Sequence, residues 1–419
     1  MRHSIAILHY SAPPAIGGVE NVLGHHARLM TQAGHSVRVV AAKGGESDCL
    51  GGASFYCFPL AGSQHEKILD TKKWLDQGVV PADFDELVQK IMNQMEEAFH
   101  GIDLLIAHNV CSLHKNLLLT AALRRFCAQP NAPRLIIWHH DFAWLSDRYQ
   151  GELHGGYPWN LLCEDWPEVN ASHVVVSEPR LHEFESLFKN RTKKAQVIPS
   201  GIDLERFLHL ASETRQLFSE MALTQGDPVL LLPVRITRRK NIELALQIVS
   251  EMRKTFTNPI LVVTGPPGPH NQDNLKYFQE LISLRDLLGL NPINSNQGAV
   301  HFMAEHCIGH LPTEWIRDFF QMADGLILPS HEEGFGIPML EAGLVGIPIF
   351  ASEIDPLKAI GGSAVTWFSP VGDPAAIAQK ITARLSEDSI FAFKKQVREH
   401  YVWAGVYARE IAPLLECSV

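Results

Sequence analysis

Short apolar stretches recur along the chain and alternate with segments of helical periodicity. Many are continuous apolar runs, a pattern typical of parallel strands that are covered by helices on both faces. Two series of such runs predict two α/β domains built from βαβ units. We expect strands at 4–10, 37–42, 103–108, 135–139, 173–177 and 196–199, and then at 229–234, 259–264, 299–303, 325–329, 347–351 and 364–368.

Helical patterns and breaker residues suggest where the domains divide. Apolar residues from Val19 to Met30 follow a 3.6-residue period, and Gly34 stands where a helix-terminating glycine belongs. The cluster Gly226-Asp227-Pro228 marks the end of a linker that we expect near 201–227. We therefore predict an N-terminal domain at 1–205, a C-terminal domain at 206–388, and a closing helix at 389–419 that packs back on the first domain.

Composition and charge exclude several classes of protein. The net charge of −10 argues against a nucleic-acid partner and, more weakly, against stable docking on anionic membranes. No apolar run approaches the roughly 18 residues that a membrane-spanning helix needs. The 7 cysteines are scattered without a CxxC pair, which suits reduced thiols in the cytoplasm. The basic patch Lys189–Lys194 is either a solvated turn or a contact for an anionic ligand or lipid surface.

A glycine pair follows the first predicted strand and opens the first helix. Gly17 and Gly18 allow the backbone to approach a ligand closely, and a helix N-terminus attracts phosphate. The spacing is not that of the dinucleotide fingerprint GxGxxG, and a plain glycine turn remains the alternative.

Two further clusters follow strands of the second series. Arg235 and Lys240 come after the first of them, where cationic side chains suit a diphosphate, although a solvated basic turn is the alternative. Arg238 and Arg239 are expected to face solvent. Glu333 and Glu341 flank a glycine-rich loop and the start of a helix. Both carboxylates can therefore reach one cleft and bind sugar hydroxyls. Alternatively, they are acids on the surface that cap the helix. The loop between them is Gly334-Phe335-Gly336.

These pieces together resemble the family-four retaining glycosyltransferases, whose fold (GT-B) consists of two Rossmann-like doubly wound domains that face each other across a cleft. The resemblance extends along essentially the whole chain. It is carried in order by Gly17-Gly18-Val19-Glu20, by 197–207, by Arg235 with Lys240-Asn241, and by 333–341.

The resemblance implies a role for each matching position. Arg235 and Lys240 would hold the donor diphosphate, which Gly17 and Gly18 would approach from the other domain. Glu333 would contact the donor hexose, and Glu341 the nucleotide ribose. The set of predicted donor contacts also includes the loop Gly334, Phe335 and Gly336. His140, in Trp138-His139-His140-Asp141, would lie near the reacting carbon, with a satisfied core or loop histidine as the alternative.

The acceptor would bind to the first domain. Its aromatic segment Trp144–Trp166 is similar to a subgroup that contains mannosylglucosylglycerate synthases, although a packed loop also explains the aromatic residues. We expect a small anionic acceptor such as a sugar acid or sugar phosphate. The candidate acceptor contacts are Lys115, Arg148 and Arg180, together with Glu20 and Asp141.

The predicted activity is transfer of a hexosyl group from a UDP- or GDP-sugar with retention, without a metal or another cofactor. Asp83-Phe84-Asp85 reads as a metal-binding DxD, but it precedes a helical pattern and is better explained as an N-cap with an acidic first turn. The alternatives are a nucleotide-sugar 2-epimerase or hydrolase of the same fold, a transferase that acts on a lipid-linked or polysaccharide acceptor, and a binding module without activity.

Overall fold

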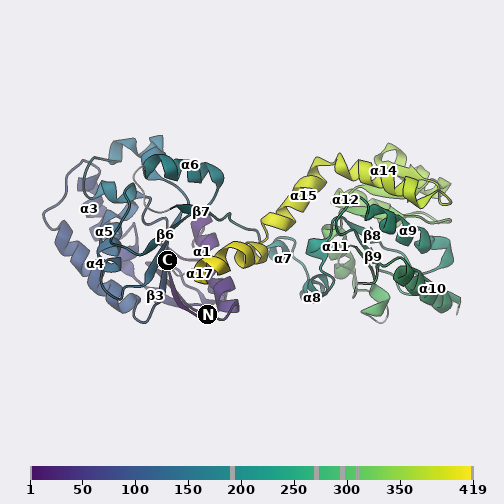
Figure 1. Ribbon diagram of the computed structural model, residues 1–419, viewed down its shortest axis with the longest axis horizontal. Coiled ribbons are helices and arrows are strands. Elements are labelled where there is room, and N and C mark those ends of the chain that lie inside the picture. The colour runs from purple at the N-terminus through teal and green to yellow at the C-terminus, as the bar shows by residue number, and fades with distance from the viewer. Residues whose placement is uncertain are drawn as a thin grey trace. The chain divides into compact units, whose positions relative to one another are not determined.

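The computed structural model describes residues 2–188, 194–268, 273–292, 298–307, 309 and 311–416. The chain forms two compact units (Figure 1). The N-terminal unit comprises Met1–Gly201 and Trp403–Val419, and the C-terminal unit comprises Ile202–Val402.

The N-terminal unit is built on a parallel sheet of seven strands in the order β3-β2-β1-β4-β5-β6-β7. The strand order reverses between β1 and β4, which is where open α/β sheets place their ligands. The strands are β1 (Ser4–Leu8), β2 (Ser36–Ala41), β3 (Ser54–Cys57), β4 (Leu104–His108), β5 (Arg134–His139), β6 (Ala171–Val175) and β7 (Ala195–Val197).

Helices cover both faces of this sheet. Ala6 and Leu8 of β1 pack in a core cluster with residues of α4 and α5, whereas Ile5 and Ile7 pack in another with residues of α1 and α17. This explains why β1 reads as a continuous apolar run. The helices are α1 (Gly18–Gln32), α2 (Ser47–Leu50), α3 (Glu66–Leu75), α4 (Phe84–Ala98), α5 (Leu117–Cys127), α6 (Glu178–Leu187), α16 (Trp403–Val406) and α17 (Ala412–Glu416), with a π-helical turn at Tyr407–Ile411. Short 3-10 helices are η1 (Pro59–Ala61), η2 (His114–Asn116), η3 (Ala143–Leu145), η4 (Asp147–Glu152) and η5 (Trp159–Leu162).

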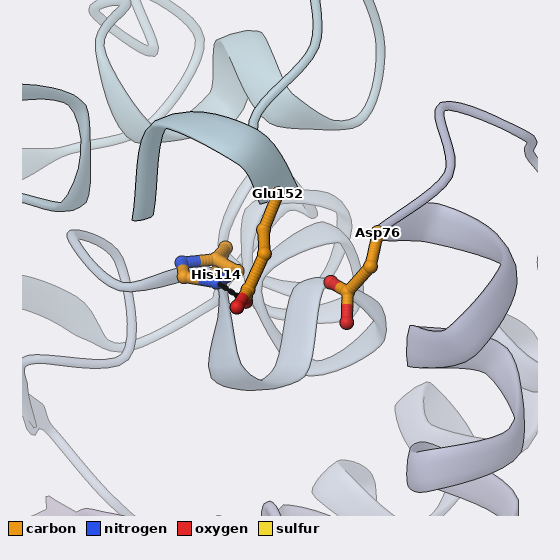
Figure 2. Close-up of side chains that lie close together, drawn as sticks. All are labelled: Asp76, His114 and Glu152. Atoms are coloured by element: carbon orange, nitrogen blue, oxygen red, sulfur yellow. Dashed lines mark hydrogen bonds and ion pairs between the residues drawn. The ribbon is translucent and has the colours of Figure 1, made fainter. Parts of the chain in front are cut away.

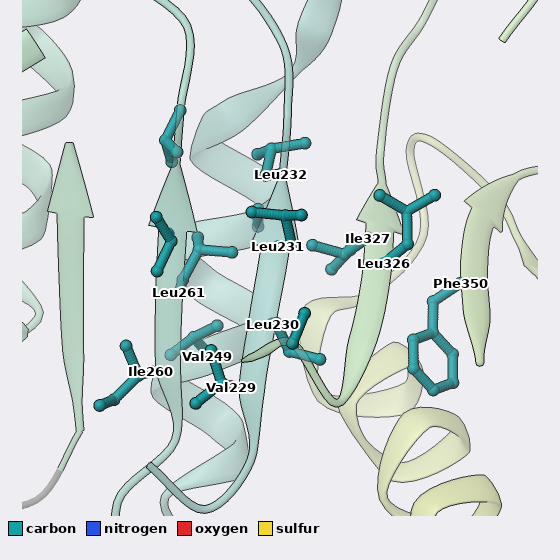
Figure 3. Packing of buried hydrophobic residues seen from close by; sticks show 14 of the residues in the cluster. Val229, Leu230, Leu231, Leu232, Val249, Ile260, Leu261, Leu326, Ile327 and Phe350 are labelled. Carbon is teal, nitrogen blue, oxygen red and sulfur yellow. The ribbon is translucent and has the colours of Figure 1, made fainter. Parts of the chain in front are cut away.

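The C-terminal unit repeats the architecture with six parallel strands in the order β10-β9-β8-β11-β12-β13. Leu230 and Leu231 of β8 lie between Leu261 of β9 and Leu326 of β11 in a dense apolar core (Figure 3). Here the order reverses between β8 and β11. The strands are β8 (Val229–Leu232), β9 (Ile260–Val263), β10 (Ala299–Phe302), β11 (Gly325–Leu328), β12 (Ile349–Ser352) and β13 (Val365–Phe368).

The helices of this unit are α7 (Leu204–Phe207), α8 (Ser212–Glu220), α9 (Ile242–Met252), α10 (Asp273–Leu287), α11 (Thr313–Met322), α12 (Ile337–Val345), α13 (Asp355–Gly361), α14 (Pro374–Ser386) and α15 (Ser389–His400). Its 3-10 helices are η6 (Leu223–Gln225), η7 (Arg238–Lys240), η8 (Met303–Glu305) and η9 (Gly362–Ala364). Two doubly wound α/β units are thus confirmed, as are the first helix and Gly34 (φ 89°) just beyond its end.

Three expectations about the chain differ from the structure. Strand β3 is absent from the predicted strands: it is only four residues long, and both of its ends are exposed at the edge of the sheet. The expected linker at 201–227 instead contains α7 and α8, and Leu217 and Phe218 of α8 pack into the core of the C-terminal unit. The expected closing helix is interrupted at 401–402.

The unit boundaries fall at 201/202 and 402/403, whereas the sequence analysis places them at 205/206 and 388/389. Helix α15 belongs to the C-terminal unit because its cationic residues bond to buried acids there. Arg398 donates to both carboxylate oxygens of Asp324 (2.8 and 2.7 Å), and Lys395 donates to Asp227 (2.7 Å). Trp403 begins the segment that belongs to the N-terminal unit, where Trp403, Val406, Ile411, Leu414 and Leu415 pack in its core.

Candidate functional site

A pocket of about 490 Å³ opens at the strand reversal of the N-terminal unit. His9 directly follows β1, and Asn109 directly follows β4, so the pocket is formed at the carboxyl ends of the two strands that flank the reversal. Residues from the loop after β5 and from the start of α6 complete its wall. The lining residues are His9, Gly18, Val19, Glu20, Asn109, Leu113, Lys115, Asp141, Phe142, Leu145, Ser146, Arg148, Tyr149 and Arg180.

The structure brings all five candidate acceptor contacts to this one pocket. Lys115 of η2, Arg148 of η4 and Arg180 of α6 supply three cations, against the two carboxylates of Glu20 and Asp141. Lys115 and Arg148 are exposed, so their charged groups are accessible to a ligand. Arg180 is held more firmly, by an ion pair with Glu183 on its own helix and a 3.5 Å contact with Asp141.

Glu20 is fixed at the pocket by the loop that follows β1. Ser11 donates its hydroxyl hydrogen to Glu20 Oε1 (2.6 Å), and His9 Nε2 lies 3.9 Å from the same oxygen. A Cβ atom on Gly17 would come within 2.1 Å of Glu20 Oε2, so glycine at this position makes room for the carboxylate. A Cβ atom on Gly18 would meet open space, and the role of both glycines at a donor stays a prediction.

Asn109 positions the backbone of the His-Asp pair. Its φ of 60° is left-handed, which asparagine tolerates, and its side-chain oxygen accepts from the backbone N–H groups of His140 (3.0 Å) and Asp141 (3.2 Å). The carboxylate of Asp141 thereby faces the pocket, while the half-buried His140 lies behind it with Nε2 3.1 Å from Nδ1 of His108.

The histidines at this pocket are held neutral. Burial lowers the pKa of His140 to about 4, assisted by nearby His9 and opposed by Asp141 and Glu20. Burial likewise lowers the pKa of His9, whose Nδ1–H donates to the carbonyl of His108 (2.7 Å). In its neutral form His9 therefore presents an unprotonated Nε2 toward Glu20.

A second constellation lies at the strand reversal of the C-terminal unit. The ammonium of Lys240, after β8, donates to both carboxylate oxygens of Glu333, after β11, at 2.6 Å each. The hydroxyl of Ser330 donates to Glu333 Oε1 (2.7 Å). Both charged side chains are only 10% exposed, and burial lowers the pKa of Lys240 although Glu333 opposes this.

Asn241 holds the loop of Lys240 in place. Its backbone is left-handed (φ 52°), and its side-chain amide donates to the carbonyls of Pro329 and Pro370, both at 2.9 Å. These carbonyls follow β11 and β13, so one buried side chain ties three strand ends together.

The three arginines of the same loop are in different surroundings. Arg238 pairs with Glu280 (2.7 Å) and lies over the ring of Tyr277, and Arg239 donates to the carbonyl of Glu332 (3.2 Å); both are exposed, as predicted. Arg235 is also exposed, and it has no hydrogen bond or ion pair with any residue that the structure describes. It is thus available to an external anion.

The glycine-rich loop leads directly into α12. Gly336 has a φ of 108°, and a Cβ atom there would come within 2.6 Å of the side chain of Leu357, so only glycine fits. Gly334 and Phe335 are exposed. The sequence predicts Glu341 in the first turn of this helix, but it lies in the second turn of α12. It is half-buried, which raises the pKa of its carboxyl group.

The motif Asp83-Phe84-Asp85 has ordinary structural surroundings. Asp83 is the N-cap residue of α4, although its side chain makes no capping hydrogen bond, and Asp85 pairs with Arg125 (2.5 Å). Of the basic patch, residues 189–193 lie outside the described residues, and Lys194 is exposed. In the aromatic segment, Trp159 and Trp166 are buried in the core, whereas Tyr149 lines the pocket.

The sequence analysis missed several lining residues. His9 and Asn109 line the pocket but are not among the predicted site residues. Both had a usable signal, because His9 is the first polar residue after the apolar run 5–8 and Asn109 directly follows the strand predicted at 103–108. Tyr149, in contrast, lies in the aromatic segment that the sequence already indicates as a possible acceptor region. No described helix has the length and apolar character to cross a bilayer.

Comparison with known protein families divides the chain in the same two parts. Residues 16–206 match the family described as Glycosyltransferase Family 4, and residues 227–387 match the family described as Glycosyl transferases group 1. The two matches together span most of the N-terminal and C-terminal units.

Among curated proteins, the chain is similar to two mannosylglucosylglycerate synthases. The protein from Petrotoga mobilis is 27% identical over 69% of this chain and 68% of its own, and that from Thermotoga maritima is 23% identical over 88% and 85%. A D-inositol 3-phosphate glycosyltransferase from Corynebacterium urealyticum is 24% identical over 66% and 64%. Among solved structures, a sucrose-phosphate synthase from Thermosynechococcus elongatus aligns with 99% of this chain and 98% of its own at a TM-score of 0.37 and 16% identity.

Proposed function

We propose, from the premise that this chain belongs to the glycosyltransferases of Family 4 and group 1, that it transfers a hexosyl group from a nucleotide-diphosphate sugar to a hydroxyl group of a small anionic acceptor. Transfer retains the configuration of the anomeric carbon. The acceptor is a sugar acid or a sugar phosphate.

The observation that carries this proposal is the convergence of Lys115, Arg148 and Arg180 on one pocket at a strand reversal. A volume of about 490 Å³ suits a small molecule and not a polymer chain. Guanidinium groups bind carboxylate and phosphate oxygens in pairs, and Glu20 and Asp141 can accept from sugar hydroxyls. The pocket therefore combines recognition of an anion with recognition of a sugar.

The names of the relatives agree with an anionic acceptor. Two describe the synthesis of a glycerate derivative, and one describes a D-inositol 3-phosphate glycosyltransferase. A carboxylate in one case and a phosphate in the other would meet the same cationic side chains.

The loops after β8 and β11 supply the donor half of the reaction. Arg235 and Lys240 bind the diphosphate, and Glu333 accepts from hydroxyls of the hexose. The bond from the anomeric carbon to the diphosphate oxygen breaks, the acceptor oxygen bonds to that carbon on the same face, and the acceptor proton leaves with the nucleoside diphosphate. The two cations stabilise the negative charge that grows on the leaving group.

The test is to incubate the purified protein, in EDTA, with UDP- and GDP-hexoses and matched acceptor pairs: glycerate and glycerol, then inositol 3-phosphate and inositol. We expect at least tenfold higher kcat/KM for one anionic acceptor than for its neutral partner, with the donor's anomeric configuration in the product by NMR. Arg148→Ala and Arg180→Ala should each reduce this preference.

Two results would refute the proposal. Equal transfer to the charged and neutral members of each pair would remove the role of the cationic pocket. Conversion of the donor alone to its epimer or to free sugar, without an acceptor effect, would favour the epimerase or hydrolase instead.

A further inference from the structure

We propose that Glu152 is a positioning residue for the pocket, because one carboxylate connects the helix that carries Arg148 to the turn that carries Lys115. The inference rests on the proposed function, since it concerns how the cations that meet the acceptor are held in place.

The carboxylate of Glu152 makes two short contacts behind the pocket wall. It accepts from Nε2 of His114 (2.6 Å) and from the ammonium of Lys72 (2.7 Å). Lys72 also donates to both oxygens of Asp76, at 2.6 and 2.7 Å. Figure 2 shows Glu152 reaching toward His114, with the carboxylate of Asp76 directed into the same space from the end of α3.

Asp76, His114 and Glu152 are residue types that bind metals, but the ammonium group of Lys72 already supplies a positive charge among them. Ligand atoms of Asp76, His114 and Glu152 lie within 4.8 Å of one another, which suits a divalent ion. The ammonium of Lys72, however, is within hydrogen-bond distance of both carboxylates and compensates their charge. The arrangement is therefore explained as an ionic anchor between α3, η2 and η4.

The helix that carries Arg148 depends on such an anchor. No residue of η4 is buried, and a six-residue 3-10 helix has poor internal hydrogen bonding. Besides Glu152, the ring of Tyr149 packs edge-on against His114, with centroids 4.8 Å apart. Just beyond η4, Nε2 of His154 donates to the carbonyl of Asp76 (3.1 Å). These contacts hold the end of η4 to α3 and to His114.

The other side of the pocket is held by the same histidine. The His114 side chain is only 2% exposed, and the next residue, Lys115, is exposed at the pocket. Asn116 fixes the following backbone by donating to the carbonyl of Leu60 (2.9 Å) and by capping α5. A shift of Glu152 would therefore move Arg148 directly and Lys115 through His114.

Lys72 also compensates the negative charge of Glu152. Glu152 is 41% exposed, so without Lys72 its carboxylate is available to pair with Arg148 or Lys115. It would then compete with the anionic group of the acceptor for these cations. Lys72 and Glu152 are thus expected to act as one unit.

The test compares Lys72→Met, Glu152→Gln and the double variant with the wild-type protein. Each variant should raise the KM for the anionic acceptor about fivefold or more and leave kcat and the calorimetric affinity for UDP or GDP within twofold. The double variant should be no worse than the more affected single variant, because the two residues serve one anchor. Lys73→Met is the matched control, since it removes an exposed ion pair with Asp70 on the same helix, and neither residue of that pair belongs to the cluster.

Hydrogen exchange separates this inference from the proposed function. Faster amide exchange in the variants, confined to 114–117 and 147–154, supports the anchor. This holds even if the wild-type protein transfers no hexose to any anionic acceptor, a result that would refute only the proposed function. Unchanged exchange, or acceptor KM values within twofold of wild type in a protein that does transfer hexose, would overturn the anchor. The anchor would also be overturned if the increases in acceptor KM of the two single variants multiplied in the double variant.

Discussion

Lys240 and Glu333 lie 93 residues apart and form two hydrogen bonds of 2.6 Å from one ammonium to both carboxylate oxygens. Because each side chain is only 10% exposed, this contact fixes the loops after β8 and β11 against each other at the strand reversal. A diphosphate bound there would share the ammonium with Glu333. The pair is a structural link, and we predict that its ammonium group also contacts the diphosphate.

We predict that Lys240→Met weakens binding of UDP or GDP at least tenfold and lowers the free energy of unfolding by about 1–3 kcal/mol. The second effect arises because the largely buried carboxylate of Glu333 loses its two shortest hydrogen bonds and keeps the Ser330 hydroxyl and a 4.0 Å ion pair with Arg239. Calorimetry and urea unfolding measure the two effects. Lys254→Met, which removes an exposed pair with Glu251, is the control. Unchanged nucleotide affinity would exclude Lys240 from the diphosphate site.

Arg235→Ala should weaken nucleotide binding without changing the stability of the fold. Its side chain is exposed and has no hydrogen bond or ion pair within the described part of the chain, so its loss should leave the unfolding midpoint unchanged. Nucleotide affinity should still fall about tenfold, because an arginine contact with phosphate is lost. Arg238→Ala, which removes the pair with Glu280, should leave the affinity near wild type. Equal effects of the two changes would contradict the choice of Arg235.

Glu333→Gln should lower kcat strongly, by about a hundredfold, while nucleotide affinity stays within a few-fold of wild type. The amide oxygen still accepts from Lys240, but it no longer supplies the charged acceptor for hexose hydroxyls. Steady-state kinetics with the preferred donor measure the change, and thermal unfolding checks that the variant remains folded. Near-normal turnover would remove Glu333 from the reaction.

His140→Ala should reduce transfer more than nucleotide binding. Because the pKa of His140 is lowered to about 4, its imidazole is neutral from pH 6 to 8 and should add no step to the pH–rate profile in that range. Below about pH 5 its protonation should begin to change the rate. Profiles of kcat/KM for both proteins, with UDP or GDP affinity measured in parallel, provide the test. A fall in nucleotide affinity as large as the fall in transfer would contradict a role near the reacting carbon.

His26 should make the protein sensitive to acid. It is fully buried against Trp138 and Trp403, neither ring nitrogen has a hydrogen-bond partner among the described residues, and burial lowers its pKa to about 3. The unfolded chain, with a histidine pKa of about 6.5, binds more protons than the folded chain between these values. Stability contributed by neutral His26 is therefore full above about pH 6.5 and is lost as the pH falls toward 3.

His26→Leu should accordingly flatten the pH dependence of unfolding between pH 6.5 and 5, by up to about 1 kcal/mol per pH unit. At pH 7.5 the variant should be as stable as the wild type or more stable, because an unsatisfied polar ring is removed. Denaturant titrations at three pH values measure this. His182→Leu, at an exposed position of α6, serves as the control. An unchanged slope in the His26 variant would contradict the assignment.

The fold was largely predictable from local patterns, and the errors have local causes. The continuous apolar runs 5–8 and 229–232 predict buried parallel strands, because both faces of such a strand are covered by helices. Ser54–Cys57 is harder to predict, because it is a short edge strand that is buried on neither face along its whole length. The helical pattern at the C-terminal end continues through 401–402, so its apolar spacing conceals the place where the chain passes from one unit to the other.

The sequence by itself determined the two parallel α/β units and the chemical character of each loop: glycines before α1, cations after β8 and carboxylates after β11. Only the tertiary structure decided which of these side chains meet. Lys115, Arg148 and Arg180 share a pocket, and Lys240 reaches Glu333, because the order of the strands brings distant loops to one edge of a sheet. Apolar periodicity is a property of neighbouring residues, whereas a binding site is a property of loops that are neighbours only after the sheet has formed.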